Sequence, residues 1–127
     1  MTLLLDTSVL IDVLRDKGNR RVLLTDLVVA GHSLATTTMN FAEVYAGMRP
    51  EEGPRTEAFL GHLTCFPITV SIARIAGSLK RQWAGKGRTL ALADMIIAAS
   101  ALEHGCTLMT DNRKHFTALK VPLYPQL

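Results

Sequence analysis

The sequence predicts an α/β fold: a three-layer sandwich in which helices flank a mostly parallel central sheet on both faces. Short apolar runs alternate along the chain with segments whose apolar residues recur at helical spacing. The first run, Leu3 to Leu5, is apolar at every position, which is typical of a strand buried on both faces. The chain has 127 residues, the usual size of one domain, so we expect a single domain over residues 1–127.

The first half of the chain contains two expected strands and four expected helices. After the strand at 3–5, apolar residues at helical spacing predict a helix over 9–14, with residues 6–8 as possible caps. A second helical pattern covers 22–30, where Gly31 provides a stop. The β-branched threonines favour a strand at 33–38, and Asn40 begins a helix that ends near Gly47. Pro54 suits the first turn of a helix that runs to about residue 63.

The second half continues the alternation. We expect a strand at 65–69, and then a helix capped by Ser71 whose apolar face extends to Trp83. The helix over 93–104 is apolar on nearly all sides in its first part, so we expect it to be covered on two sides, and Gly105 ends it. A strand is expected at 107–110 and a fifth at 121–124.

The composition excludes several classes of protein. Hydrophobic residues make up 48% and charged residues 20% of the chain, so we expect a packed core rather than disorder. The longest aliphatic runs are about five residues, well short of the ~20 that cross a bilayer, and no basic segment marks a secretory leader. Cys65 and Cys106 lack metal-ligand spacing; a bridge between them is left open, but they resemble small core residues of a cytoplasmic protein. The net charge of +3 permits a polyanionic partner without requiring one.

Four acidic residues occupy positions that parallel sheets bring together. Asp6 and Asp111 directly follow expected strands, whereas Glu43 and Asp94 fall in the first turns of expected helices. Ligands of open parallel sheets bind outside the carboxyl ends of the strands, so all four could face one edge. Each also has a purely structural interpretation: a helix cap for Asp6, a capping box of Asn40 with Glu43, a dipole partner for Asp94 and an Asx-turn for Asp111.

Taken together, the acids favour a metal site. Asp94 is the only charged residue in an apolar stretch, and an unpaired buried carboxylate is costly. Two carboxylates ~4 Å apart repel by roughly 4 kcal/mol at an effective dielectric of about 20. A hard divalent cation would relieve that repulsion, and all-oxygen ligands indicate Mg²⁺ or Mn²⁺. Since Mg²⁺ usually binds substrate phosphate as well, the pattern suggests phosphoryl chemistry in which metal-activated water is the nucleophile.

Four motifs resemble those of a known family. They are LLLDTSVLID at 3–12, NFAEVYAG at 40–47, ADMIIAASA at 93–101 and LMTDNRKHF at 108–116. Their order, and the length of the chain, resemble those of PIN-domain ribonucleases, and most closely the VapC-type toxins of toxin–antitoxin pairs. The match runs nearly from end to end.

The resemblance implies an Mg²⁺- or Mn²⁺-dependent endoribonuclease that forms a homodimer and binds a cognate VapB-type antitoxin, whose C-terminal segment blocks the acidic pocket. By motif, Asp6, Glu43 and Asp94 match the three principal, metal-holding acids. The fourth site residue of the family often lies two positions after the strand-ending threonine. That position is Asn112 here, while Asp111 lies one position earlier, so the fourth residue is either of the two.

Candidate RNA contacts surround these acids. Residues 58–93 contain no acid, and Lys86 and Arg88 in this span could contact phosphates, as could Arg113. A solvated surface explains the same charges equally well. Thr7, Ser8 and Thr110 could contact phosphate or support the acids, or serve only as turn and cap residues. His115 is interpreted as a surface or RNA-contacting residue rather than a general base.

Two other functions remain open from the residues alone. A small-molecule phosphatase with an aspartyl nucleophile would need a second Asp two residues after Asp6, where Ser8 stands. A non-catalytic RNA-binding or phosphoreceiver-like module would use the acids as caps only. Such a receiver pairs adjacent acids near its first strand, a pair that this chain lacks.

Overall fold

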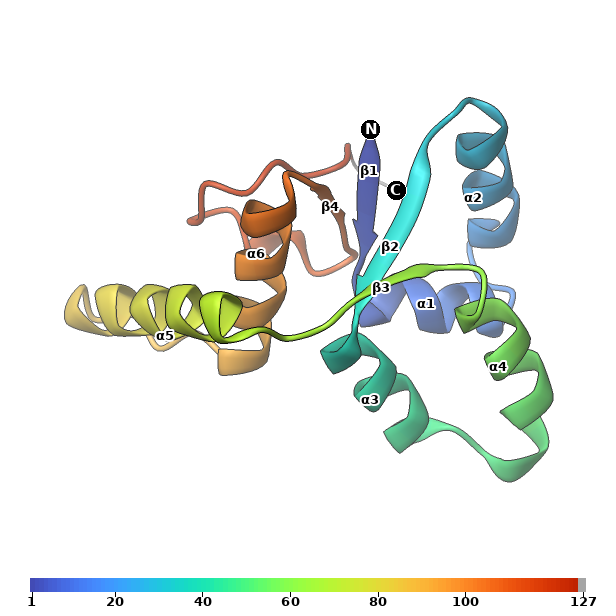
Figure 1. The fold of residues 1–127 in the computed structure, drawn as a ribbon, viewed down its shortest axis with the longest axis horizontal. Helices are drawn as coiled ribbons and strands as arrows, with labels where there is room; N and C mark the ends of the chain where they lie inside the picture. The colour runs from blue at the N-terminus through green and yellow to red at the C-terminus, as the bar shows by residue number, and fades with distance from the viewer. Residues whose placement is uncertain (126–127) are drawn as a thin grey trace.

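The computed structural model describes residues 1–125, so residues 126 and 127 of the predicted domain lie outside the described residues. The strands are β1 (Thr2–Leu5), β2 (Ser33–Thr37), β3 (Thr64–Phe66) and β4 (Thr107–Met109). The helices are α1 (Thr7–Leu14), α2 (Arg20–Val29), α3 (Thr38–Gly47), α4 (Gly53–Leu60), α5 (Val70–Gly85) and α6 (Leu92–His104). Short 3₁₀ turns lie at η1 (Pro50–Glu52) and η2 (Arg113–His115). Figure 1 shows this arrangement.

The sheet is parallel throughout its four strands, in the order β3-β2-β1-β4. The strand β1 is therefore central, with β2 on one side and β4 on the other. The parallel sheet and the alternation of strands and helices confirm the predicted α/β class. The carboxyl ends of β1, β2 and β4 lie next to one another, as the sequence analysis required of a shared site.

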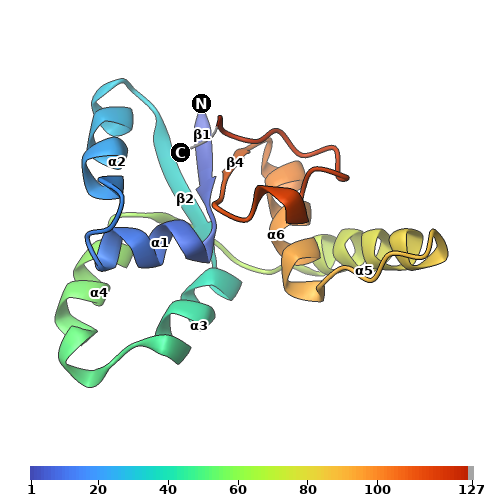
Figure 2. The same cartoon turned by 180° about the vertical axis from the view of Figure 1, so that it is seen from behind.

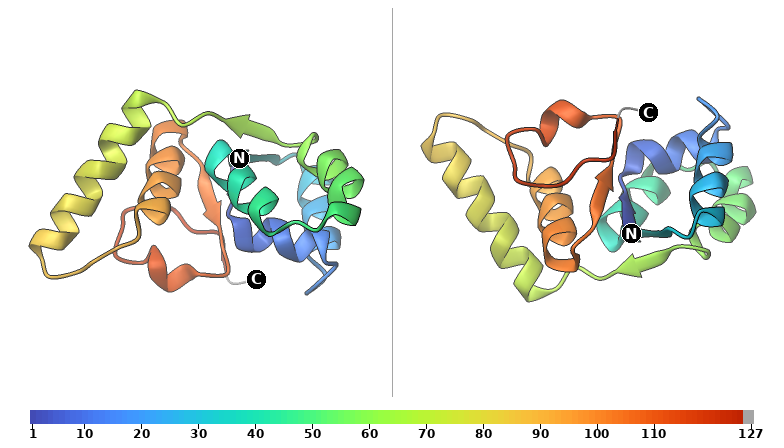
Figure 3. Two further views of the ribbon diagram at one scale, coloured as in Figure 1. Left: turned by 90° about the horizontal axis from the view of Figure 1, so that it is seen from below. Right: turned by 90° about the horizontal axis from the view of Figure 1, so that it is seen from above.

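Helices cover both faces of the sheet, which confirms the three layers (Figures 1 and 2). Alternate residues of β1 face opposite sides: Leu4 belongs to one buried cluster, and Leu3 and Leu5 belong to the other. The first cluster lies against α5 and α6, and the second against α1 to α4. The views in Figure 3 show α5 projecting beyond the sheet while it packs along α6.

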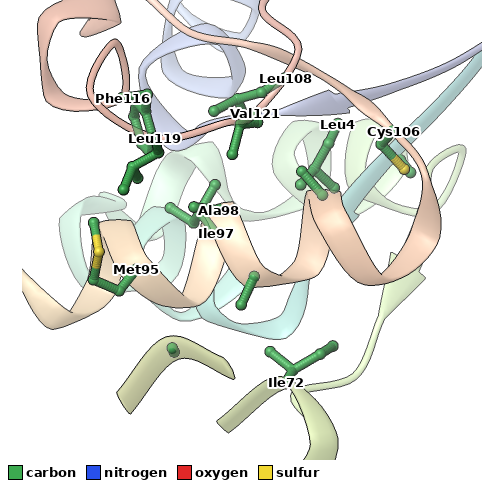
Figure 4. Close-up of a cluster of buried hydrophobic side chains, with 14 residues drawn as sticks. Leu4, Ile72, Met95, Ile97, Ala98, Cys106, Leu108, Phe116, Leu119 and Val121 are labelled. Carbon is green, nitrogen blue, oxygen red and sulfur yellow. The ribbon is translucent and has the colours of Figure 1, made fainter. Parts of the chain in front are cut away.

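Helix α6 is buried on two sides, as its apolar sequence predicted. Figure 4 shows Ala98 and Ile97 beneath Leu4 and the C-terminal segment, with Ile72 of α5 on the opposite side. Phe116 of the C-terminal segment is fully buried in the same cluster. These contacts hold the first turn of α6, which carries Asp94, at a defined place beside the sheet.

Prolines correct two of the strand predictions. The strand expected at 65–69 ends at Phe66 because Pro67 cannot donate a ladder hydrogen bond. The fifth strand expected at 121–124 is wrong among the described residues: only an isolated parallel bridge joins Leu108 to Leu123. The amide of Leu108 donates to the Pro122 carbonyl, but Pro122 has no N–H of its own with which to extend the ladder.

Threonines, rather than the expected residues, cap two helices. Helix α3 begins at Thr38. The hydroxyl of Thr37 accepts a hydrogen bond from the backbone N–H of Asn40, so Thr37 and not Asn40 is the N-cap. The expected capping box of Asn40 with Glu43 is wrong, because the box consists of Thr37 and Asn40. Glu43 consequently lies in the second turn. Helix α5 is capped by Thr69 instead of Ser71, since the extended backbone at Thr69 directs its hydroxyl to the Ile72 amide.

No helix within residues 1–125 has both the length and the apolarity needed to cross a membrane. Cys65 and Cys106 are free thiols, so the bridge that the sequence left open is absent.

Candidate active site

Asp6 is anchored at the end of the central strand. Its backbone N–H donates to the Met109 carbonyl at 3.0 Å, which extends the β1–β4 pairing by one step. Its side chain is buried, and Oδ1 accepts from the Thr7 backbone N–H at 2.8 Å while Oδ2 accepts from the Thr110 hydroxyl at 2.7 Å. Asp6 is also the N-cap of α1. Asp6 therefore caps α1 and at the same time holds a buried carboxylate at the strand end, so its structural interpretation does not exclude its interpretation as a site residue.

The surroundings of Asp6 shift its pKa. Burial raises this pKa above the ordinary value, and the hydrogen bonds from Thr110 and Thr7 lower it. The negative charges of Asp94 and Glu43 raise it further, so the net direction is upward. Glu43 and Asp94 therefore each lie within electrostatic reach of Asp6 at the end of the central strand.

Glu43 is exposed on α3 and linked to the start of α1. Its Oε1 accepts a hydrogen bond from the Thr7 hydroxyl at 2.7 Å, although the two residues are 36 positions apart in the chain. This contact replaces the capping role that the local sequence suggested. It leaves the other carboxylate oxygen free of any hydrogen bond found among residues 1–125.

Asp94 lies in the first turn of α6, as predicted. A carboxylate at this position interacts favourably with the helix dipole. It also contacts η2: Asp94 Oδ2 lies 3.2 Å from Nδ1 of His115, whose side chain is 45% exposed. Sequence analysis assigned His115 to the surface and missed this pairing, because nothing local links residues 21 positions apart.

Asp111 is paired with an arginine of α2. Its Oδ1 accepts from the Arg20 guanidinium at 2.9 Å, and Asp12 Oδ2 lies 3.8 Å from the same side chain. Burial and the neighbouring Asp111 raise the pKa of Asp12, whereas Arg20 lowers it. The Asx-turn expected at Asp111 is not what orders the turn, since the Asn112 amide donates to the Thr110 hydroxyl instead. Sequence analysis missed Arg20 because the pair spans 91 positions.

The candidate RNA contacts fall into two groups. Thr7, Ser8 and Thr110 lie beside the acids, and Ser8 Oγ accepts from the Asp111 amide at 3.2 Å. The Arg113 guanidinium donates a hydrogen bond to the Tyr124 carbonyl. Lys86 and Arg88 lie beyond the end of α5, over the ring of Trp83, at 4.7 Å and 5.4 Å from its centre. Figure 3 shows that the C-terminal end of α5 projects from the rest of the fold.

The acidic edge has the donor chemistry of an open magnesium or manganese site. Within residues 1–125, no cluster of three or more His, Cys, Asp or Glu side chains is arranged closely enough to hold a metal ion. Mg²⁺ does not need one, because it is usually held by one or two carboxylates together with water and substrate phosphate. Asp6 carries the repulsion of Asp94 and Glu43, and all three supply hard oxygen donors. The residues therefore fit a hydrated divalent cation.

Comparison with known proteins agrees with this geometry. The family model of the PIN domain matches residues 3–121. The chain belongs to the PIN-domain family. It is also 34% identical to Ribonuclease VapC19 of Mycobacterium tuberculosis over 124 residues, which cover 98% of this chain and 95% of that protein. The resemblance found in the four motifs is thereby confirmed, and the likeness supports a nuclease.

Solved structures share the PIN fold along nearly the whole chain. VapBC2 from Rickettsia felis, bound to a DNA fragment from its promoter, superposes with a TM-score of 0.86 at 21% identity, covering 98% of each chain. A toxin–antitoxin complex from Klebsiella pneumoniae gives a TM-score of 0.80 at 25% identity, covering 98% of this chain and 99% of the other. These matches confirm the PIN-like three-layer architecture.

The raised pKa of Asp6 predicts a cost in stability. In the PIN domain without metal, the Asp6 carboxyl binds its proton more tightly in the folded state than in the unfolded chain, where its pKa has the ordinary value of 3.8. The resulting stabilisation is complete below that value and is lost as pH rises through the folded pKa. We expect Asp6→Asn to raise the free energy of unfolding at pH 7, with a smaller gain at pH 4. Urea denaturation in EDTA at both pH values measures this; a variant less stable than wild type at pH 7 contradicts it.

Arg20 is predicted to stabilise the fold by neutralising Asp12 and Asp111. Because its side chain is only 15% exposed, Arg20→Ala should lower the free energy of unfolding by about 1–3 kcal/mol, between the values for exposed and buried pairs. Arg55→Ala is the matched control, since Arg55 is 57% exposed and pairs with Glu52 within one turn. The Arg55→Ala substitution should lower the free energy of unfolding by less than about 0.5 kcal/mol. Equal losses in the two variants would show that Arg20 is an ordinary surface cation.

Proposed function

We propose that this PIN domain, residues 1–127, is an Mg²⁺- or Mn²⁺-dependent endoribonuclease, the toxin of a VapBC-type toxin–antitoxin pair. The observation that carries the proposal is that the negative charges of Asp94 and Glu43 both raise the pKa of the buried Asp6 at the end of the central strand. Membership of the PIN family and the likeness to Ribonuclease VapC19 support the same activity.

Asp6, Glu43 and Asp94 would hold the divalent cation. When bound, a cation there lowers the pKa of water and offsets negative charge on a phosphate. The chain's own contribution is orientation. Thr110 and the Thr7 amide hold the Asp6 carboxylate. The Thr7 hydroxyl donates to Glu43 and would hold the Glu43 carboxylate in place.

For the fourth site residue we propose Asn112 rather than Asp111. Asp111 is committed to Arg20 at 2.9 Å. The Asn112 side chain is exposed, and its backbone amide donates to Thr110, whose hydroxyl in turn donates to Asp6. Asn112 is therefore one residue removed from the Asp6 carboxylate and carries no negative charge that would need a second cation.

Substrate binding would use charge more than stacking. Lys86 and Arg88 lie over the Trp83 ring just beyond the end of α5, where they would contact phosphates of the RNA. Arg113 follows the acidic edge in η2. Contacts of this kind position the RNA backbone without identifying bases, and they weaken as salt rises.

We propose a homodimer and a VapB-type antitoxin as the protein partners, acting in the cytoplasm. The toxin–antitoxin complexes with the same fold support this proposal. A hollow of about 820 Å³ lies between α2 and α4, lined by Leu24, Val28 and Phe59 among others. This apolar surface could receive part of an antitoxin whose end reaches the acids.

Cleavage of RNA is the direct test of the proposed function. The purified protein is incubated with total RNA and Mg²⁺ or Mn²⁺, with and without EDTA, and the cut ends are mapped. We expect discrete internal cuts that EDTA abolishes. Cleavage that persists in excess EDTA contradicts metal dependence. Trapping of a phosphoaspartate at Asp6 would favour the phosphatase alternative, and metal-independent RNA binding without cuts would favour a binding module.

Removal of one site carboxylate should abolish cleavage without unfolding the protein. We expect Asp94→Asn to lower kcat by about 100-fold or more, because the variant loses several kcal/mol of transition-state stabilisation. Asp26→Asn, on the exposed face of α2, is the matched control and should retain wild-type turnover. Wild-type-like cleavage by a folded Asp94→Asn protein would exclude Asp94 from the site.

A further inference from the structure

Asn40 is fully buried at the start of α3, directly behind the acids. A buried primary amide has two donor hydrogens and one acceptor oxygen, and burial is tolerated when these find partners. Asn40 finds them on two sides: Thr37 on its own helix, and Asp6 with Thr7 at the end of the central strand. It therefore joins the N-terminus of α3 to the site.

The orientation of the amide is determined by its neighbours. Asn40 Oδ1 accepts from the Thr37 backbone N–H at 3.2 Å and from the Thr37 hydroxyl at 2.7 Å. A backbone N–H can only donate, so the oxygen of the amide must face Thr37. The NH₂ group must then face the site, where it donates to Thr7 Oγ1 at 3.0 Å and, over a longer 3.4 Å, to Asp6 Oδ1.

This orientation also determines the direction of the next hydrogen bond. Because Thr7 Oγ1 accepts from Asn40, its single proton is available for Glu43, whose Oε1 lies at 2.7 Å. Hydrogen bonds thus run one way from Thr37 through Asn40 and Thr7 to Glu43. The same NH₂ group also donates to Asp6, so Asn40 contacts one carboxylate directly and is linked to a second through the Thr7 hydroxyl.

We propose that Asn40 is a positioning residue that holds the Asp6 carboxylate and, through the Thr7 hydroxyl, the Glu43 carboxylate in the orientation that the site requires. The inference rests on the proposed function. The capping box with Thr37 accounts for the oxygen of the amide but leaves its NH₂ group unexplained. Residues that orient metal-binding side chains typically contribute 10- to 100-fold to metal affinity or activity.

A pair of substitutions at Thr7 isolates the connection. Thr7→Val keeps the shape of the side chain but removes the hydroxyl, whereas Thr7→Ser keeps the hydroxyl. We expect Thr7→Val to lower kcat about tenfold with KM for RNA unchanged, and to weaken Mn²⁺ binding in calorimetry by a similar factor. Thr7→Ser should retain most of the wild-type kcat and most of the Mn²⁺ affinity. Ser71→Ala, which removes an exposed hydroxyl bonded to Glu103 on the far side of α6, should match wild type.

Asn40→Asp provides a second variant, since its Oδ1 still accepts from Thr37 while the donor to Thr7 and Asp6 is lost. We expect kcat and Mn²⁺ affinity to fall as in Thr7→Val. A rise in KM alone would make Thr7 a substrate contact and overturn the proposal, as would equal damage in Thr7→Ser and Thr7→Val. If neither Thr7→Val nor Asn40→Asp folds, the role is structural and the proposal is wrong.

The proposed function can fail separately. If the wild-type protein cleaves no RNA, the nuclease assignment is wrong, while the inference about Asn40 is then decided by Mn²⁺ calorimetry alone. Equal Mn²⁺ affinity in wild type and Thr7→Val, or no binding by wild type, overturns it. Normal wild-type cleavage together with an unaffected Thr7→Val protein overturns the inference and leaves the nuclease intact.

Discussion

The buried carboxylate of Asp6 at the end of β1 is the constraint around which this PIN domain is arranged. Central placement between β2 and β4 removes it from water, and removal from water raises its pKa. Donors from Thr110 and the Thr7 amide compensate part of that cost. The charges of Asp94 and Glu43 then add repulsion that hydrogen bonds within residues 1–125 do not cancel. A divalent cation with its own water shell is the natural counter-charge for such an edge.

The other three acids, Asp94, Glu43 and Asp111, differ in the groups that pair with them. Asp111 is neutralised within the chain by Arg20, so it adds stability rather than charge to the edge. Asp94 lies beside His115 of the turn η2, and among residues 1–125 the side chain of Glu43 accepts a hydrogen bond only from the Thr7 hydroxyl. Asp94 and Glu43 thus both repel the carboxylate of Asp6, whereas Asp111 is paired with Arg20. In the function proposed above, this repulsion lowers the stability of the metal-free protein and is relieved when a cation binds.

The sequence predicted the parts of this site that depend on local pattern. Asp6 and Asp111 were found because each follows an apolar strand, and Asp94 because it is a lone charge in an apolar helix. Glu43 was found because it follows the start of the helix after the second strand, although it lies in the second turn rather than the first. Arg20 and His115 were missed because their partners are distant in the chain. Asn40 was misassigned as an N-cap, since an Asn three residues before a Glu has the spacing of a capping box whether or not it faces a site. The third strand was extended too far and a fifth was added where prolines interrupt pairing.

The most direct test of the central claim is where a paramagnetic cation binds. Mn²⁺ is titrated into the ¹⁵N-labelled protein, and loss of backbone amide signals by paramagnetic broadening is followed. We predict that broadening begins at residues 6–8, 43–44 and 93–95 together, and that it disappears in Asp6→Asn. Broadening that begins instead around the acidic turn at Glu51 and Glu52, or that is unchanged in Asp6→Asn, would contradict a cation site built on the central strand.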